Sequence, residues 1–198
     1  MTSREGLTAR QRILETAYDL FSHRGVRDVG VDEIIARSGV AKATLYNHFP
    51  TKNHLVLAFL DLREERWTFD MVETEARARG GTPEEHLLAI FDVFGEWFHR
   101  EDFDGPAFIS VLLEMGPLHP LGRASIQHLE NINALVAGMA EEADLREPRE
   151  FALSWHILMK GSIIAAIEGD IDAANRAKDM ARHLIERHRL TNGAHVGR

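Results

Sequence analysis

The chain has 198 residues, of which 44% are hydrophobic, with 23 Lys and Arg against 31 Asp and Glu for a net charge of −8. That length is enough to bury a substantial core in one or two domains. The absence of cysteine excludes disulfides, thiolate metal sites and a cysteine nucleophile. The first twelve residues are polar, and no apolar run approaches the ~20 residues of a membrane span. We therefore expect no secretory signal, no membrane partner and a soluble, cytoplasmic protein.

The negative charge is unevenly distributed along the sequence. Residues 1–55 carry eight basic and six acidic side chains, a net of +2, whereas residues 56–198 carry fifteen and twenty-five, a net of −10. No acidic residue lies between Glu33 and Asp61, although Arg37, Lys42 and Lys52 all fall there. The segment therefore predicts a small basic surface on a chain whose average charge would repel duplex DNA.

Apolar residues recur with a helical period along the chain, which predicts an all-α fold of about nine helices without a sheet. Capping boxes at Thr8–Gln11 and Thr82–Glu85 mark two helix starts, and Thr51 and Asp172 are expected to cap two more. The expected helices cover residues 8–25, 30–38, 41–49, 51–79, 82–98, 106–116, 120–139, 148–163 and 172–184.

Residues 31–49, VDEIIARSGVAKATLYNHF, contain two short expected helices joined by a turn at Gly39. Glycine supplies the left-handed conformation of a tight turn, and Ile34, Val40, Leu45 and Phe49 can form a small core. This pattern is typical of a helix-turn-helix whose second helix has a free outer face. An ordinary helical hairpin is the alternative, because turn motifs also match by chance. The outward side chains lack a carboxylate and suit groove edges and phosphates; they are Lys42, Thr44, Tyr46, Asn47 and His48.

The N-terminal 60 or so residues resemble the DNA-binding domain of the TetR family of transcriptional regulators. The resemblance rests on residues 20–25 (LFSHRG), 31–34 (VDEI), 38–40 (SGV) and 42–49 (KATLYNHF), with Lys52 and Leu55 beyond. It implies that Thr44, Tyr46, Asn47 and His48 lie in or beside the major groove and that Lys42 and Lys52 hold phosphates. Gly30 and Ala41 replace capping residues common in the family, so neither is included among the contacts.

The resemblance also implies a helix-turn-helix DNA-binding domain over residues 1–55, a ligand-binding and dimerisation domain over residues 56–190 and a flexible tail over residues 191–198. Large side chains in the second domain can line an apolar cavity, although most such residues are plain core. We expect a small, mainly apolar effector to contact Phe94, Phe98, Phe108, Met115, His119, Trp155, His156 and Met159.

Small residues in the last two expected helices allow close helix packing, and TetR regulators dimerise through a four-helix interface. The resemblance therefore implies a homodimer, and a twofold dimer predicts a pseudo-palindromic operator of double-stranded DNA. We expect a ligand-responsive regulator, most often a repressor in this family. The expected interface residues are Gly161, Ala165, Ala173, Ala177 and Ala181.

The sequence lacks the common catalytic motifs: a Gly-x-Ser-x-Gly elbow, a phosphate-binding glycine loop and a His-Glu-x-x-His zinc helix. It has one Glu-x-x-His pair, Glu96 and His99, whereas a di-iron site needs two such pairs and further glutamates. We therefore expect no enzyme, no catalytic residue, no cofactor and no metal. Two alternatives stay open: a helical module that binds protein through its turn motif, and a metal-dependent helical enzyme.

Overall fold

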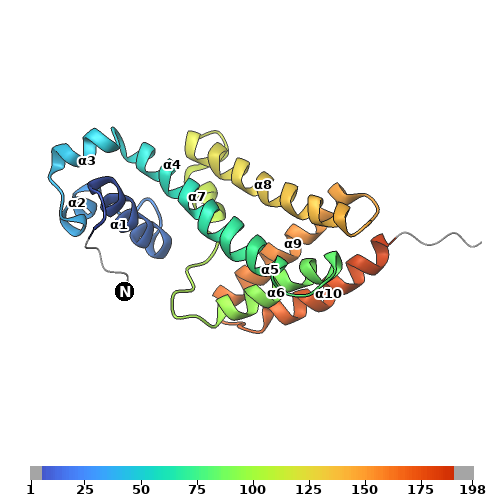
Figure 1. The fold of residues 1–198 in the computed structure, drawn as a ribbon. Coiled ribbons are helices and arrows are strands. Elements are labelled where there is room, and N and C mark those ends of the chain that lie inside the picture. Colours follow the sequence, from blue (N-terminus) through green and yellow to red (C-terminus); the bar gives the residue numbers. More distant parts are fainter. Residues whose placement is uncertain (1–5, 190–198) are drawn as a thin grey trace, which may run out of the picture. The chain divides into compact units, whose positions relative to one another are not determined.

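The computed structural model describes residues 6–189, and helices account for nearly all of their regular structure (Figure 1). The helical stretches α4 (Lys52–Arg63), η1 (Glu64–Thr74) and α5 (Glu75–Arg77) follow one another without a break. Residues 6–189 therefore contain nine continuous helical segments, as predicted, and the all-α fold class is confirmed. No strand occurs within residues 6–189, apart from an isolated bridge between Leu145 and Arg189. In chain order the elements are α1 (Ala9–Arg24), α2 (Val31–Ser38), α3 (Lys42–His48), α4 (Lys52–Arg63), the π-helical η1 (Glu64–Thr74), α5 (Glu75–Arg77), α6 (Pro83–Phe98), α7 (Ala107–Met115), α8 (Pro120–Glu142), α9 (Pro148–Ile167) and α10 (Ala173–His188).

Side-chain caps set several helix starts. The capping boxes Thr8–Gln11 and Thr82–Glu85 are both formed, and the Thr51 hydroxyl accepts from the backbone N–H of His54 at 3.3 Å. The predicted cap at Asp172 is wrong, because its backbone (φ −92°, ψ 4°) is not extended and its side chain makes no capping bond. A capping side chain needs extended backbone to reach the free N–H groups of the first turn.

Packing divides the described residues into two compact units. The first unit contains residues 6–66 and 104–129, and the second contains residues 67–103 and 130–189. The packing boundary therefore differs from the predicted boundary at residue 55, which α4 crosses without interruption. The division into domains by function stays a prediction, and its tail, residues 191–198, lies outside the described residues.

In the first unit, α1 packs against α2, α3 and α4, and α7 packs against α4. The face of α1 that the apolar pattern predicted is buried, including Ile13, Leu20 and Phe21. The Phe59 ring from α4 meets the edges of Phe21 and Tyr18, each with ring centres 5.5 Å apart. Burial of these large apolar side chains fixes α1 on α4.

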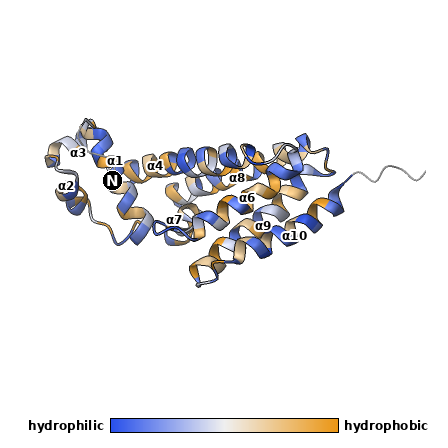
Figure 2. Ribbon diagram, turned by 60° about the horizontal axis from the view of Figure 1, so that its bottom comes forward, coloured by the Kyte–Doolittle hydropathy of each residue, from blue (hydrophilic) through white to orange (hydrophobic). Residues whose placement is uncertain are grey.

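In the second unit, α6 packs against α5, α9 and α10, and α9 packs against α10. Apolar and polar residues are interspersed along these helices (Figure 2), and the apolar ones meet in an aromatic core. Phe91 lies between Trp155 at 5.2 Å and Phe94 at 6.1 Å, and Trp67 lies 5.7 Å from both Phe94 and Trp97. Tilted and edge-to-face ring pairs of this kind add to the stability that burial alone provides.

The helix α9 is long and apolar enough, by length and composition, to cross a membrane. Arg149, Glu150 and Lys160 interrupt its apolar residues, so no long apolar run marks this helix in the sequence. Of the most apolar stretch of α9, 44% is buried inside the protein, and the core residues Trp155 and Met159 lie on this helix. A helix buried on one face in a core passes the same test of length and composition, so this finding is weak evidence for a membrane span.

Candidate nucleic-acid interface

The turn between α2 and α3 depends on Gly39, which has a left-handed backbone (φ 65°, ψ 34°) and donates its N–H to the Ile35 carbonyl at 3.2 Å. Residues with a side chain rarely adopt this conformation. The side chains of Ile34, Leu45 and Phe49 are at most 3% exposed, and they hold the two helices together from within. The predicted helix-turn-helix is therefore present.

The outer face of α3 consists of the predicted residues. Leu45 is 1% exposed and faces the core, whereas Tyr46 on the same helix is 41% exposed. Lys42, Asn47 and His48 are exposed, and Thr44 is half-buried. An exposed α-helix of this size fits the major groove of B-DNA, where amide, hydroxyl and imidazole groups can bond base edges.

The basic side chains around α3 differ in the strength of their ion pairs with neighbouring carboxylates. Lys42 lies 3.6 Å from Asp32, but their side chains are 66% and 89% exposed, and such surface pairs contribute little. Glu33, by contrast, binds Arg24 at 2.7 Å and Arg37 at 2.9 Å. Lys42 is therefore the more accessible positive charge beside this face.

Lys52 lies at the start of α4, but its ammonium is engaged within the first unit. Its ammonium donates to the Val26 carbonyl at 2.5 Å, and its side chain is partly buried. Burial lowers the pKa of Lys52, while the charges of Glu114 and Asp28 oppose that shift. The side chain satisfies a loop carbonyl of the same unit, so a phosphate contact would require that bond to break. Nothing in the sequence pattern indicated this contact, because it joins residues 26 positions apart.

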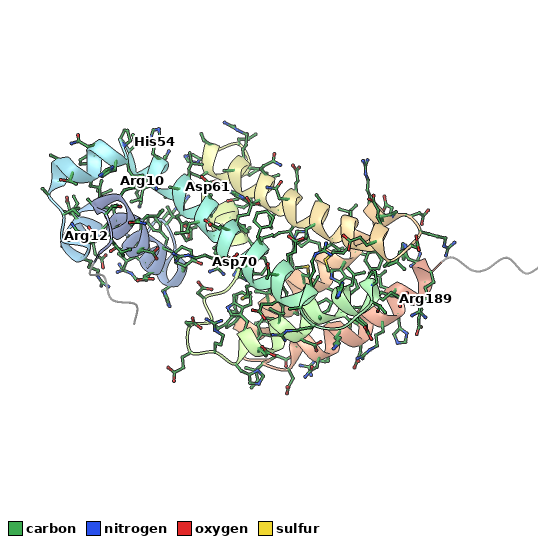
Figure 3. The ribbon with its side chains drawn as sticks, viewed as in Figure 1. Arg10, Arg12, His54, Asp61, Asp70 and Arg189 are labelled. Atoms are coloured by element: carbon green, nitrogen blue, oxygen red, sulfur yellow. The ribbon has the colours of Figure 1, made fainter. Side chains whose placement is uncertain are left out.

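Arg10 of α1 is a basic residue outside the set of contacts predicted from the sequence. It is exposed, and its guanidinium lies 5.2 Å from the ring centre of Phe49. Figure 3 shows Arg10 and His54 near the junction of α3 and α4. Stacking on an aromatic face holds an arginine in place while its N–H groups stay available. The helical period of α1 could have placed Arg10 on the exposed side, but its proximity to Phe49 depends on tertiary packing.

The loop before α2 is held by α7. One oxygen of the Glu114 carboxylate accepts from Val26 N–H at 3.3 Å, and the other accepts from Arg27 N–H at 3.0 Å. The Arg27 guanidinium also donates to the Glu114 carbonyl. A Cβ at Gly25 (φ 79°) would collide with the same carboxylate. Gly25 therefore has two reasons to be glycine, its positive φ and the close approach of Glu114.

A buried ion pair also holds α4 in the first unit. Arg63 bonds both oxygens of Asp104, at 2.5 and 2.9 Å, and donates to the Gly105 carbonyl and the Tyr18 hydroxyl, each at 3.1 Å. Burial opposes the charge of Arg63, but these hydrogen bonds leave its pKa above the usual value. A buried pair is stable when its remaining donors and acceptors are bonded in this way.

Five of the eight predicted effector contacts belong to the second unit. Phe94, Phe98, Trp155 and Met159 are at most 4% exposed and form part of its aromatic core. His156 is also buried, and its Nδ1 lies 2.7 Å from the Asn133 Oδ1. Burial, with the charge of Lys160 in second place, lowers the pKa of His156 to about 3, so its imidazole is neutral at neutral pH.

Three buried polar atoms of this core have no hydrogen-bond partner within the described residues: Trp67 Nε1, Thr68 Oγ1 and Trp155 Nε1. Each leaves a hydrogen bond unformed at a cost in free energy. The aromatic core could be anticipated from the spacing of its residues, but Trp67 and Thr68 of η1 were not among the predicted contacts, which were taken from the helices after residue 82.

The remaining three predicted effector contacts belong to the first unit. Phe108 is buried and stacks on His128 with ring centres 4.9 Å apart. Met115 is half-buried, and His119 accepts from the backbone N–H of Leu121 at 3.2 Å. Contact between any of the eight residues and an effector stays a prediction.

The predicted interface residues divide into two groups. Gly161 is exposed and Ala165 half-buried on α9, whereas Ala173, Ala177 and Ala181 of α10 are at most 6% exposed. The three alanines pack inside the second unit, where α10 lies against α6 and α9, so their assignment to a surface between two copies needs correction. Small side chains fit a close helix contact within one chain as well as between chains, which is why the pattern misled.

Glu96 and His99, the one Glu-x-x-His pair, are engaged separately. The Glu96 carboxylate binds Arg79 through two bonds of 2.7 and 2.8 Å, and His99 Nδ1 lies 2.7 Å from the Gly95 carbonyl oxygen. Within residues 6–189, no three His, Asp or Glu side chains are grouped closely enough to hold a metal ion.

These features define a class of protein: an all-helical chain with an N-terminal helix-turn-helix whose second helix presents an exposed polar face. Residues 13–59 match the family described as "Bacterial regulatory proteins, tetR family". SCO4454, a TetR-family transcriptional regulator from Streptomyces coelicolor, has a similar structure with a TM-score of 0.82 and 26% identity, covering 91% of this chain and 95% of that one. The helix-turn-helix segment is thus that of the TetR family of transcriptional regulators, and the whole chain is similar in fold to a member of that family.

Two curated relatives from Mycolicibacterium smegmatis match the N-terminal part. The transcriptional repressor KstR is 36% identical over 78 residues, 39% of this chain and 37% of KstR. The transcriptional activator FasR is 45% identical over 51 residues, 26% of this chain and 23% of FasR. The matched segment thus spans well under half the length of either relative, and the likeness to them concerns the helix-turn-helix end.

Proposed function

We propose that the protein is a cytoplasmic, homodimeric DNA-binding regulator, a repressor that a small and mainly apolar effector releases from its operator. The observation that carries the proposal is the geometry of α3. Its buried Leu45 fixes α3 on the core of the helix-turn-helix, and the opposite face of α3 exposes Tyr46, Asn47 and His48. In a helix-turn-helix this second helix is the one that enters the major groove.

The side chains of α3 suit two kinds of contact. Thr44, Tyr46, Asn47 and His48 carry short or planar hydrogen-bonding groups for base edges, and Lys42 supplies charge for phosphates. Arg10 adds a second phosphate contact to this proposal because its guanidinium is exposed beside Phe49. Lys52 is left out of the set because Val26 occupies its ammonium.

The charge of the rest of the chain also favours contact with DNA through the N-terminal end. Residues 56–198 carry a net charge of −10, which a DNA duplex repels. Only the basic end is therefore attracted to DNA, and contacts with phosphates at random sites remain few. Such a protein depends on base contacts for its affinity, which is typical of a regulator with low non-specific binding.

An exposed apolar stripe on α9 supports the homodimer. Leu153, Ile157, Ile164 and Ile167 are 41–69% exposed and fall at helical spacing on one side, and Met180 of α10 is 58% exposed. An apolar surface of this kind on α9 and α10 favours burial against a second copy. A twofold dimer would place two copies of α3 about 34–36 Å apart, one turn of DNA.

The aromatic core of the second unit supports an apolar effector. Its rings offer dispersion contacts, and the unbonded Trp67 and Trp155 N–H groups offer hydrogen bonds to an acceptor on the effector. His156 is neutral there, so no charged partner is required. Repression is the direction proposed, although relatives named as repressor and as activator both match.

Induction requires the effector to bind more tightly to the form that cannot hold the operator. A hundredfold loss of operator affinity corresponds to about 2.7 kcal/mol of coupling. Burial of a few ring-sized apolar groups provides a free energy of that size. Linkage demands that the operator weaken effector binding by the same factor.

Selection of bound fragments from genomic DNA tests the proposal. The wild-type protein should enrich fragments that contain a pseudo-palindrome, and nuclease protection should show two half-sites one DNA turn apart. The Tyr46→Ala protein, processed in parallel, should lose that enrichment. Enrichment of the same fragments by both proteins, or of no fragment by the wild type, would remove α3 from DNA recognition.

A further inference from the structure

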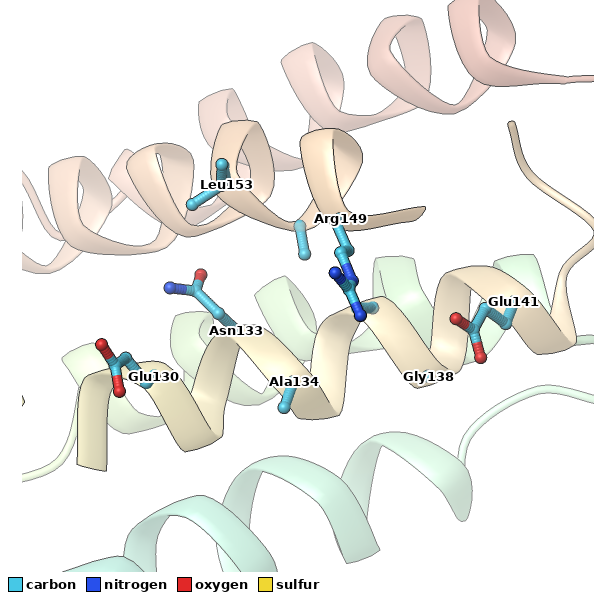
Figure 4. Close-up of a pocket in the computed structure, with 9 residues that line it drawn as sticks. Glu130, Asn133, Ala134, Gly138, Glu141, Arg149 and Leu153 are labelled. Atoms are coloured by element: carbon cyan, nitrogen blue, oxygen red, sulfur yellow. The ribbon is translucent and has the colours of Figure 1, made fainter. Parts of the chain in front are cut away.

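Two features of the structure lie outside the exposed face of α3. In the second unit, a half-open groove of about 840 Å³ lies between α8 and α9 (Figure 4). Its wall includes Leu153 of the exposed apolar stripe, so the groove belongs to the surface proposed for the dimer. In the first unit, Glu114 of α7 binds the loop between α1 and α2. Given the DNA contact proposed above, we propose that Glu114 is a positioning residue, which fixes α2 and α3 in the orientation that fits the operator.

The backbone around Val26 is held from two sides. The Glu114 carboxylate accepts from the N–H groups of Val26 at 3.3 Å and of Arg27 at 3.0 Å. The Val26 carbonyl accepts from the Lys52 ammonium at 2.5 Å. The Val26 side chain is 2% exposed and anchors the loop in the core. Two helices that are distant in sequence, α7 and α4, therefore fix the same short segment of backbone.

This loop leads directly into α2, whose own start has no side-chain cap. Gly30 occupies the N-cap position and offers no side chain to the first turn, so local capping does not set where α2 begins. Arg24 of α1 holds the loop through the Asp28 carbonyl at 2.9 Å and the start of α2 through Glu33 at 2.7 Å. Glu114 supplies the contact from outside the helix-turn-helix. The orientation of α2, and of α3 packed on it, therefore depends on α7.

The helix α7 is a firm support for this contact, because it is held within the first unit at other points. Asp104, just before α7, is bound by Arg63 through bonds of 2.5 and 2.9 Å. Phe108 on the first turn of α7 is buried and stacks on His128 with ring centres 4.9 Å apart. Buried contacts of this kind limit the movement of the helix that carries Glu114.

The charge of Glu114 distinguishes a positioning role from an electrostatic one. A carboxylate on the DNA-binding unit repels phosphates, so by charge alone its removal should strengthen binding to any duplex. Loss of a positioning contact has the opposite effect on the operator, because α3 then adopts orientations in which its side chains miss the base edges. A scrambled duplex, which is held through its phosphates, does not depend on that orientation.

Anisotropy titrations of the Glu114→Ala protein test the proposal, with the genomic fragment that the wild type enriches and with a scrambled duplex. Operator affinity should fall about tenfold, because two hydrogen bonds to a charged group are lost, and affinity for the scrambled duplex should not fall. Glu114→Gln retains one acceptor oxygen and should keep more operator affinity than Glu114→Ala. Glu65→Ala, which removes an exposed carboxylate of the same unit, is the charge control and should not weaken operator binding. Operator affinity equal to or above that of the wild type, in a Glu114→Ala protein that urea unfolding shows to be folded, would overturn the proposal.

Amide hydrogen exchange tests the same role without DNA. In the Glu114→Ala protein the amides of α2 and α3 should exchange about tenfold faster than in the wild type, whereas those of α1 and α4, which pack on each other through Phe21 and Phe59, should not change. Unchanged exchange in α2 and α3, or an equal rise in all four helices, would contradict the positioning role. Loss of operator binding by Tyr46→Ala but not by Glu114→Ala would refute only this role. Enrichment of no fragment by the wild type would refute the proposed function, and the positioning role with it.

Discussion

Two lysines beside the helix-turn-helix differ in the partners of their ammonium groups. This difference decides which of them is available to a DNA phosphate. Lys42 has only the weak pair with Asp32 at 3.6 Å, so its charge stays available to a phosphate. Lys52 donates to Val26 at 2.5 Å and is partly buried. A free ammonium releases counterions from DNA when it binds, whereas an ammonium that stays in the protein does not.

We predict that Lys42→Ala flattens the plot of log affinity against log salt by about one unit. Lys52→Ala should leave the slope unchanged and instead lower the free energy of unfolding, because it removes the bond to Val26. Fluorescence anisotropy at several salt concentrations and urea unfolding provide the two measurements. A slope that falls by the same amount in both variants would return Lys52 to the phosphate contacts.

The buried His156 makes stability depend on pH. Its folded pKa of about 3 lies below the ordinary value near 6.5, so between these values the unfolded chain binds the proton that the folded chain refuses. Stability therefore rises with pH in this window and is lost as pH falls from about 6.5 towards 3, by at most about 1.4 kcal/mol per unit for one proton.

The His156→Gln protein should show a smaller loss of unfolding free energy than the wild type between pH 6.5 and pH 4. Chemical denaturation at a series of pH values measures this difference. His183→Gln, at an exposed histidine of α10, is the control and should follow the wild-type curve. Parallel curves for all three proteins would mean that His156 gains its proton without penalty.

At the scale of elements, one buried ion pair joins α4 to the chain just before α7. Arg63→Met should lower the free energy of unfolding by about 3–5 kcal/mol, because it leaves the Asp104 carboxylate buried without a partner. Arg182→Met, which removes the exposed pair with Asp179 on α10, should cost less than about 1 kcal/mol. Urea unfolding of both variants measures the contrast. A similar small loss for both would show that Asp104 finds water when Arg63 is removed.

The elements also show what local sequence determines. The capping boxes at Thr8 and Thr82 and the left-handed Gly39 follow from interactions within four residues, and they could be predicted. Asp172 could not, because the residues before it form a tight turn that leaves it without extended backbone. The π-helical geometry of η1 carries no sequence signal of its own.

The candidate site likewise contains features that local sequence predicts and features that depend on tertiary packing. The exposed face of α3 follows from helical period and from the resemblance, so the exposure of Lys42 and Tyr46 could be predicted, and their contact with DNA stays a prediction. The bond from Lys52 to Val26 and the stacking of Arg10 on Phe49 join distant parts of the sequence, and only the folded chain reveals them. The sequence of one chain also does not distinguish alanines that pack inside the protein from alanines at an interface between two copies.

At the scale of the whole molecule, the exposed stripe of α9 is expected to hold two copies together. Ile157→Glu should shift the protein towards monomers, because it places a charge without a partner in an apolar interface. Leu118→Glu, at a residue 86% exposed in the loop before α8, is the control and should leave the assembly unchanged. Sedimentation velocity at micromolar concentration measures both. A wild-type protein that is already monomeric would contradict the dimer.

The proposed function depends most on α3 as the element that contacts the DNA bases. Anisotropy titration of the selected operator and of a scrambled duplex, with wild-type and Tyr46→Ala proteins, tests this directly. We predict that Tyr46→Ala loses about 1–3 kcal/mol of operator affinity, keeps its affinity for the scrambled duplex and unfolds at the wild-type urea concentration. Operator affinity equal to that of the wild type, in a folded Tyr46→Ala protein, would contradict the account.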